Sequence, residues 1–328
     1  MQGEFRFSPL ENELDFLLSS LEHLTEASAV SGGAANPSAD QIRHQKRHLK
    51  YALLHLCSSI ELLFKVRLQQ KHWSLVFSNI DKADKTAQDH GEFESVDFHE
   101  LTERLVRICK VALSDKQIRQ LKSLRKRRNQ LEHFGAVDSL PAMSASISTM
   151  VSFTIDFVEA TFRPESLAEQ DFLIAELRSK LGTCNAFVEQ RWKEIRKEVD
   201  GFYSVIECPT CQQLALEVEA GSVRCRFCYH SSRPEEAANE YIARVLGYDS
   251  RYAVEKDGGE WPLSTCPECG DGTLVTRLPK HDGFCFNCGQ KWESGELARC
   301  CDCNEFYRTD DVDVGICTTC FRAKVEKD

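Results

Sequence analysis

The first 200 residues place an apolar side chain at every third or fourth position, which is the period of an amphipathic helix. The first such stretch follows a capping box made by Ser8 and Glu11, and its leucines predict a helix that ends near Ala29. Small and polar residues over 28–40 predict a linker. The next apolar stretch predicts a long second helix that continues to about His72.

Four more helices complete the predicted N-terminal domain. Residues 79–95 are polar and predict a loop before the third helix. Helices joined by short connections favour an up-and-down arrangement, so we expect a six-helix bundle over residues 1–200. The expected limits are a third helix capped by Asp97 and Glu100 and running through Ile108, a fourth from a cap at Asp115 to near Gly135, a fifth over 141–161, and a sixth over 166–199 opened by Ser166 and Glu169.

The pattern changes after Gly201 to short β-like runs separated by turn residues and cysteine pairs. Thirteen of the 16 cysteines lie between Cys208 and Cys320, and twelve of them form Cys-x-x-Cys pairs. Pairs of this kind are typical of metal sites in a reducing compartment. The predicted fold class is mainly α, with an N-terminal helical bundle followed by three small β-rich zinc ribbons. We expect the ribbons at 201–233, 263–293 and 294–328, with a helical linker at 234–262.

The six cysteine pairs combine into three candidate sites of four thiolates. In each site thirteen or fifteen residues separate the two pairs, enough for a hairpin that returns the second pair to the same ion. Four soft ligands favour tetrahedral zinc, although iron could use the same set. A closed shell of four thiolates has no open position, so we expect structural zinc, with Cys301 outside the shell. The predicted ligands are Cys208, Cys211, Cys225, Cys228, Cys266, Cys269, Cys285, Cys288, Cys300, Cys303, Cys317 and Cys320.

Charge differs between the two parts of the chain. The formal net charge is -10; residues 1–200 carry 27 Lys and Arg against 29 Asp and Glu, whereas residues 201–328 carry 14 against 22. Nucleic-acid-binding modules need clustered Lys and Arg, so the acidic ribbons favour a protein partner or dimer contacts over RNA. No apolar run reaches the roughly 18 residues of a membrane span and no secretory signal is visible, so we expect a soluble cytoplasmic protein.

One predicted helix is strongly basic. Seven cations fall between Lys116 and Arg128, in a domain that is otherwise slightly acidic. Such a cluster attracts anions, including the phosphates of RNA. The candidate nucleic-acid-binding residues at its end are Arg125, Lys126 and Arg127.

The basic run leads into the string Arg128-Asn129-Gln130-Leu131-Glu132-His133. Asn129 and His133 are four positions apart and share a helix face, and Arg128 is long enough to reach the same place. This string resembles the RNxxxH signature of the HEPN superfamily, whose members are small helical bundles and often metal-independent ribonucleases. The resemblance covers about residues 1–200 in architecture and these six positions in sequence.

The resemblance implies catalytic roles for three residues. His133 would handle the proton of the attacking 2'-OH, Arg128 would hold the phosphate, and Asn129 would orient the histidine or the substrate. It also implies RNA as substrate, a homodimer with one site built from two facing motifs, products ending in a 2',3'-cyclic phosphate, and a place in stress or antiviral defence. Glu61 and Lys65 resemble the E-x3-K pattern of some HEPN nucleases.

Two other classes of function fit the same sequence. The first is a non-catalytic adaptor, whose bundle dimerises while the zinc ribbons bind a protein or nucleic-acid partner. The second is an inactive HEPN bundle that binds a nucleotide or a nucleotidyltransferase partner. No glycine-rich phosphate loop is visible, which argues against an NTPase. His44, His48 and His55 on the second predicted helix are assigned no role.

Overall fold

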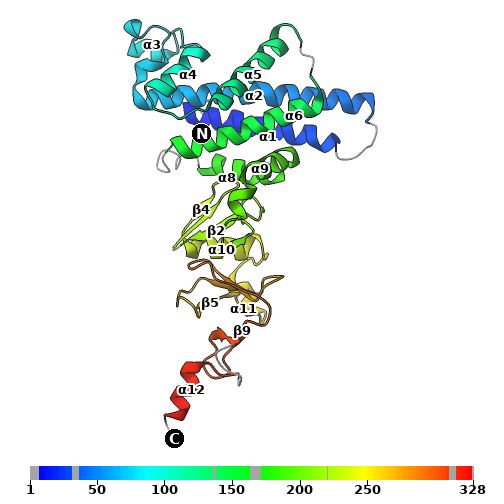
Figure 1. The fold of residues 1–328 in the computed structure, drawn as a ribbon, viewed down its shortest axis with the longest axis vertical. Helices are drawn as coiled ribbons and strands as arrows, with labels where there is room; N and C mark the ends of the chain where they lie inside the picture. The colour runs from blue at the N-terminus through cyan, green and yellow to red at the C-terminus, as the bar shows by residue number, and fades with distance from the viewer. Residues whose placement is uncertain are drawn as a thin grey trace. The chain divides into compact units, whose positions relative to one another are not determined.

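The structure is a computed structural model that describes residues 7–31, 37–135, 138–162, 171–219, 221–309 and 315–326. The chain divides into two compact units, residues 1–193 and residues 194–328. The first unit is helical, and every strand found in the described residues belongs to the second unit (Figure 1). The cysteine pairs also lie in the second unit. The predicted fold class, mainly α with small strand-rich modules after the helical part, is confirmed.

The first unit consists of helices, several of which reach more than five turns. The last of them, α9, crosses into the second unit. These helices are α1 (Pro9–Ser31), α2 (Ala39–Lys71), the 3-10 helices η1 (Trp73–Val76) and η2 (Ile80–Lys82), α3 (Lys85–His90), α4 (Phe98–Arg107), α5 (Asp115–His133), α6 (Leu140–Thr161), α8 (Asp171–Thr183) and α9 (Asn185–Val199).

The core of the first unit lies between α1, α2 and α6. Leucines on one face of α1, such as Leu17 and Leu21, are fully buried, and so are Leu53 and Phe64 of α2. Burying such a side chain completely contributes about 1.5–3 kcal/mol. The capping box at the start of α1 is present, because Glu11 N–H donates to the Ser8 hydroxyl at 3.2 Å and Ser8 N–H donates to the Glu11 carboxylate at 3.1 Å.

Two predicted boundaries are wrong for local reasons. The polar segment 79–95, predicted to be a loop, contains η2 and α3. Helix α3 begins because the Asp84 carboxylate accepts from Ala87 N–H at 2.8 Å, and it ends at Gly91, whose φ is 72°. The cap of α5 is Ser114 and not Asp115: the Ser114 hydroxyl accepts from Gln117 N–H, and the Gln117 side chain accepts from Ser114 N–H at 2.8 Å.

The predicted sixth helix is two helices, α8 and α9, separated at Cys184. The buried Cys184 thiol lies at the start of α9, where it accepts from the backbone N–H groups of Phe187 and Ala186 and so caps this helix. The predicted opening at Ser166 and Glu169 lies outside the described residues. The predicted linker over 28–40 is shorter than expected, since α1 continues to Ser31 and α2 begins after a capping box at Ser38.

After the end of α9, the described residues of the second unit form two four-stranded antiparallel sheets, one two-stranded hairpin and three helices. In the first sheet Leu216 pairs with Cys225, and in the second Leu274 pairs with Cys285, so the two modules share a register. The elements are β1 (Val205–Ile206), β2 (Leu216–Glu219), β3 (Ser222–Cys225), β4 (Ser231–Ser232), α10 (Pro234–Arg244), α11 (Arg251–Lys256), β5 (Leu263–Ser264), β6 (Leu274–Thr276), β7 (Gly283–Cys285), β8 (Lys291–Trp292), β9 (Leu297–Arg299), β10 (Phe306–Arg308) and α12 (Thr318–Val325).

The third module differs from the first two. It has only the hairpin β9–β10 within the described residues, and its last cysteine pair lies at the start of α12 instead of between strands. The hairpin packs on the second module, because Leu297 and Phe306 contact the apolar cluster around Trp292. Ion pairs support this contact, since Arg299 and Arg277 both reach Glu260, at 2.7 and 3.0 Å.

Candidate metal centres and the groove beside helix α5

The structure brings the twelve predicted cysteines together in three groups of four. Within each group all four Sγ atoms lie within 4.8 Å of one another. The Sγ to Sγ distances include 3.7 Å for Cys211 to Cys225, 3.7 Å for Cys269 to Cys285 and 3.8 Å for Cys303 to Cys317. A tetrahedral ion with four thiolates at about 2.3 Å requires about 3.8 Å between sulfurs. Each group therefore fits a metal ion such as zinc.

Five of the six cysteine pairs adopt the same backbone turn. In the pair Cys266–Cys269, for example, Gly270 N–H donates to Cys266 C=O at 2.9 Å, and Cys266 N–H donates to Asp271 C=O at 2.7 Å. The residue after the second cysteine has a φ in the left-handed region in all five. These residues are Gln212, Tyr229, Gly270, Gly289 and Asn304, with φ of 58°, 59°, 75°, 73° and 64°. The repeated turn explains why the pairs point both thiols in one direction.

The sixth pair uses a helix instead of this turn. Cys317 is the N-cap of α12, and its Sγ accepts from Cys320 N–H at 3.5 Å. Cys300 accepts from Cys317 N–H at 3.3 Å, and the N–H groups of Cys317 and Cys303 lower the pKa of the Cys300 thiol to about 6. Such donors stabilise the thiolate form that a metal requires. Cys301 is exposed and lies outside the group.

The three centres differ in exposure. All four cysteines of the first centre are buried, whereas Cys269 and Cys288 of the second are exposed. In the third centre only Cys300 is buried. Solvent and chelators therefore reach the third centre most directly. Each of the 16 cysteines, all of which lie in the described residues, is free of disulfide bonds.

The RNxxxH string lies at the C-terminal end of α5. This helix buries only Leu121 and Leu124, and its last turn is open to solvent. Asn129 and His133 are exposed. Arg128 is 39% exposed; its Nε lies 3.0 Å from Glu132, and its Nη1 donates to the Asn129 side chain at 3.2 Å.

The three basic residues before this string have different surroundings. Arg127 is occupied by partners within the chain: it forms an ion pair with Asp138 at 2.8 Å and donates to the Ser146 hydroxyl at 3.0 Å. Arg125 stacks on the Phe98 ring at 5.0 Å from its centroid. Lys126 is exposed, and no ion-pair partner for it lies among the residues that the structure describes. Of the three, Lys126 is the one most available to a phosphate.

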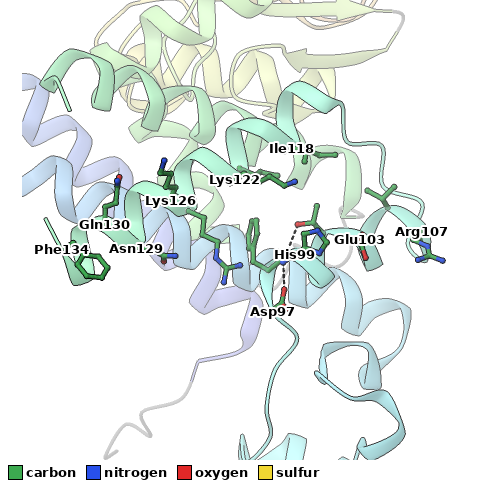
Figure 2. A pocket seen from close by; sticks show the side chains of 15 residues that line it. Asp97, His99, Glu103, Arg107, Ile118, Lys122, Lys126, Asn129, Gln130 and Phe134 are labelled. Atoms are coloured by element: carbon green, nitrogen blue, oxygen red, sulfur yellow. Dashed lines mark hydrogen bonds between the residues drawn. The ribbon is translucent and has the colours of Figure 1, made fainter. Parts of the chain in front are cut away.

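A groove of about 830 Å³ runs between α4 and α5 (Figure 2). Asn129 and Phe134 lie at one end and Arg107 at the other. Its lining is mostly apolar, and Phe134 is 91% exposed at the rim. The α5 side carries three cations, Lys122, Arg125 and Lys126. The α4 side carries Asp97 and Glu103 together with one cation, Arg107, so the two rims differ in charge.

Glu61 and Lys65 form an ion pair on α2, with Lys65 Nζ 2.7 Å from the Glu61 carboxylate and 3.1 Å from the Ser95 hydroxyl. Glu61 and Arg128 line the same small cavity of about 30 Å³, together with Cys57. Burial raises the pKa of the Cys57 thiol to about 12. The E-x3-K pair therefore lies next to the RNxxxH string.

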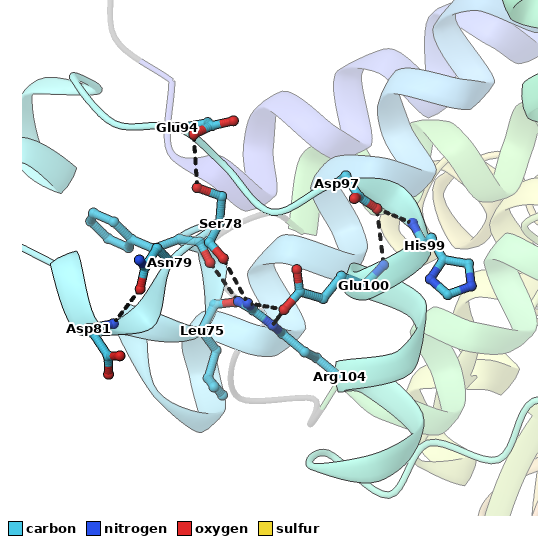
Figure 3. A network of polar contacts seen from close by, with 10 residues as sticks. Leu75, Ser78, Asn79, Asp81, Glu94, Asp97, His99, Glu100 and Arg104 are labelled. Atoms are coloured by element: carbon cyan, nitrogen blue, oxygen red, sulfur yellow. Dashed lines mark hydrogen bonds and ion pairs between the residues drawn. The ribbon is translucent and has the colours of Figure 1, made fainter.

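A buried arginine that the sequence analysis does not single out holds α4 in place. Arg104 is only 7% exposed, pairs with Glu100 one turn earlier, and donates to the carbonyls of Leu75 and Phe77 at 2.6 Å (Figure 3). These bonds fix α4 against η1 and so set one wall of the groove. The signal in the sequence is the spacing of Glu100 and Arg104, which is a common pattern on helices.

A second missed residue is Glu13 on α1. Its side chain is fully buried; one carboxyl oxygen accepts from the Ser59 hydroxyl at 3.1 Å, and the other has no hydrogen-bond partner among the described residues. Burial raises its pKa from 4.5 to about 8. The carboxyl is therefore mostly protonated at neutral pH.

Comparison with known proteins finds no matching family model, no matching curated protein and no matching solved structure. Among the described helices, none is long and apolar enough to cross a membrane.

Proposed function

We propose that the chain is a metal-independent endoribonuclease of HEPN type, with zinc at its three cysteine centres. The proposal rests on the solvent-accessible location of Arg128, Asn129 and His133 at the C-terminal end of a basic helix. Arg128 and Asn129 contact each other there, and His133 is exposed one turn further along the same helix. Exposed thiols and thiolate centres also favour a reducing compartment, and we propose the cytoplasm.

The proposed reaction needs no metal. The His133 imidazole accepts the proton of a ribose 2'-OH, whose oxygen attacks the neighbouring phosphorus in line. The P–O5' bond breaks, and a proton is returned to the leaving oxygen, giving a 2',3'-cyclic phosphate and a 5'-OH. Arg128 contacts the phosphate oxygens as charge builds on them, which requires it to exchange Glu132 for the substrate. A second copy of the chain supplies the facing motif.

The cysteine centres have a structural role in this proposal. Four thiolates close the coordination shell, so an ion held there has no position for a substrate. The centres hold the small modules folded, and the modules offer their acidic surface to a partner. We propose zinc because four soft thiolates suit it best in a reducing compartment.

The test uses protein purified with its zinc and assayed on labelled single-stranded RNA in buffer without added metal. His133→Ala should lower the cleavage rate about a hundredfold or more, since a lost general base costs that much. His90→Ala, which changes another exposed histidine, should cleave like wild type. Wild-type protein that is as inert as His133→Ala on several RNAs would contradict the proposal.

A second candidate function is the adaptor, and the apolar groove between α4 and α5 favours it. Grooves with an apolar floor and charged rims are suited to an amphipathic helix of a partner. Val106 lines this groove and is 38% exposed. Val106→Glu should therefore block docking of the partner helix without creating a cavity in the core. Loss of a stoichiometric partner in Val106→Glu, with binding kept in His133→Ala and no RNA cleavage by wild type, would favour the adaptor.

A further inference from the structure

Four histidines and a tyrosine gather where α1 meets α2. His23 is on α1, and the others follow one face of α2 at spacings of four, three and four residues. The rings are close: the centroids of His44 and His48 are 4.3 Å apart, and those of His23 and His48 are 5.1 Å apart. The members of this histidine cluster are His23, His44, His48, Tyr51 and His55.

The central pair of the histidine cluster has the geometry of two ligands of one ion. His23 Nδ1 and His48 Nδ1 are 3.0 Å apart. Imidazole nitrogens bind zinc at about 2.0–2.1 Å, so two adjacent ligands lie about 2.9 Å apart at a right angle and about 3.4 Å apart in a tetrahedron. The two nitrogens share a hydrogen bond, so an ion between the rings replaces its proton, which moves to Nε2 of the same ring or to solvent, while the nitrogens themselves move little.

We propose that His23, His48 and His44 form a transition-metal site, open on one side, that binds Zn²⁺ or a similar ion and links α1 to α2. The site is separate from the three cysteine centres and independent of the proposed ribonuclease activity. It is a histidine site on a helix pair, so its ligand class is a borderline divalent cation such as Zn²⁺, Ni²⁺ or Cu²⁺.

His44 supplies the third ligand because it precedes His48 by four residues. Two histidines at this spacing share a helix face and can bind one ion. His44 is exposed, so its ring is free to turn. Outside the cysteine centres, no three ligand atoms of this kind lie within 4.8 Å of one another in the described residues. The pair is therefore preformed, and His44 joins it when the ion binds.

The charges around the site are mixed. Glu22 and Glu26 of α1 favour a cation there, and Arg47 of α2 opposes it. Glu26 acts on both His23 and His48. Burial lowers the pKa of His23 and of His48, which favours the neutral form of each ring.

His55 is a neighbour of the site and not a ligand. Its Nδ1 is within 2.9 Å of the Ser19 hydroxyl, and its ring lies 5.8 Å from the Phe16 ring. It packs between α1 and α2 as a half-buried aromatic residue. Its ring lies 5.4 Å from the His23 ring, but its Nδ1 is taken by Ser19, so we assign it no ligand role and use His55→Ala as the control for the ligand variants.

The experiment measures zinc content after the three cysteine centres are filled. Full-length protein is dialysed against micromolar Zn²⁺, passed over a desalting column and assayed by atomic emission. Wild type and His55→Ala should hold one equivalent beyond the three in the cysteine centres. His48→Ala and the milder His23→Gln should hold only the three, with affinity at the extra site lowered about tenfold or more in a competition with a coloured chelator.

The result that overturns the proposal is equal zinc content in wild type, His23→Gln and His48→Ala. An extra equivalent that survives in both ligand variants would place the ion elsewhere and would overturn it as well. Circular dichroism at 222 nm checks that the helices are intact in each variant. A second readout is thermal unfolding: excess Zn²⁺ should raise the melting temperature of the helices in wild type and His55→Ala but not in His23→Gln.

Discussion

The helical unit and the cysteine modules are stabilised in different ways. In the helical unit fully buried leucines such as Leu17, Leu21 and Leu53 form a continuous core between long helices. In the second cysteine module the buried apolar cluster consists of Leu274 and Trp292 with two of the cysteines themselves. A module of this size cannot bury enough apolar surface to fold by itself, so its ion supplies the missing free energy.

The two units should therefore respond in different ways to the same change of conditions. Metal removal should unfold only the modules, because the helical unit keeps its fold through its core of buried leucines. Acid should also weaken the modules, because protons compete with the metal for thiolates. Glu13 should have the opposite effect in the helical unit: its buried carboxyl is mostly protonated, so its contribution to stability grows as the pH falls from 8 to 4.5.

Removal of the metal should give the largest effect. Structural zinc contributes about 10–16 kcal/mol to the folding of small zinc modules, so a strong chelator should unfold residues 194–328 while the helices of residues 1–193 persist. Limited proteolysis followed by mass spectrometry should find the new cleavage sites in the second unit only. The third centre should lose its ion first, because three of its four cysteines are at least partly exposed.

The matched pair for this prediction is Cys303→Ser and Cys301→Ser. Both thiols are exposed and they lie two residues apart, but only Cys303 belongs to a four-cysteine group. Cys303→Ser should reduce the metal content by one ion, and Cys301→Ser should leave it unchanged. Equal metal content in the two variants would contradict the assignment of the third centre.

The pH dependence of the helical unit should give the next largest effect. Because the pKa of Glu13 is raised from 4.5 to about 8, folding favours its protonated form. This contribution is fully present below pH 4.5 and is lost as the pH rises toward 8. The free energy of unfolding should fall by up to about 5 kcal/mol over this range. Urea unfolding followed by circular dichroism at 222 nm, at several pH values, measures it.

Glu13→Gln keeps the size of the side chain and removes its titration. It should therefore flatten the fall in stability between pH 4.5 and 8. Glu22→Gln changes a carboxyl on the same helix that is 47% exposed, and it should leave the slope as in wild type. A slope that is unchanged by Glu13→Gln would show that another group causes the pH dependence.

Arg104→Ala should have the smallest of the three effects and should also be confined to the helical unit. It removes a buried guanidinium and leaves the carbonyls of Leu75 and Phe77 without their donor. We expect a loss of about 3 kcal/mol in the free energy of unfolding. Arg107→Ala, an exposed arginine on the same helix, should change it by less than about 0.5 kcal/mol. Similar losses in both variants would contradict the role given to Arg104.

The sequence predicts best those parts of the fold in which one physical rule dominates. Helices α1, α2 and α6 are found because their buried faces repeat over many turns. The grouping of the cysteines is found because two pairs separated by a hairpin can reach only one ion. The prediction is wrong where two rules compete over a few residues. Ser114 and Asp115 can both cap a helix, and only the backbone geometry decides that Ser114 does so.

The parts of the fold that the sequence does not predict depend on contacts between residues that are far apart in the chain. Helix α3 is too short to show an apolar period, and Cys184 ends one helix and caps the next without a glycine or proline at that position. The partners of Glu13 and of His23 lie on α2, so neither environment is visible in the local sequence. The candidate site is predicted as three residues, but the groove beside it needs the packing of α4 on η1.

The protonated carboxyl of Glu13 also couples folding to the proton balance of the solution. At neutral pH the unfolded chain carries this group as a carboxylate, so the helical unit takes up a proton as it folds. A cysteine module does the reverse, since its thiols give up protons to the solvent when they bind their ion. The heat released when the whole chain folds therefore depends on the ionisation enthalpy of the buffer, with contributions of opposite sign from the two units.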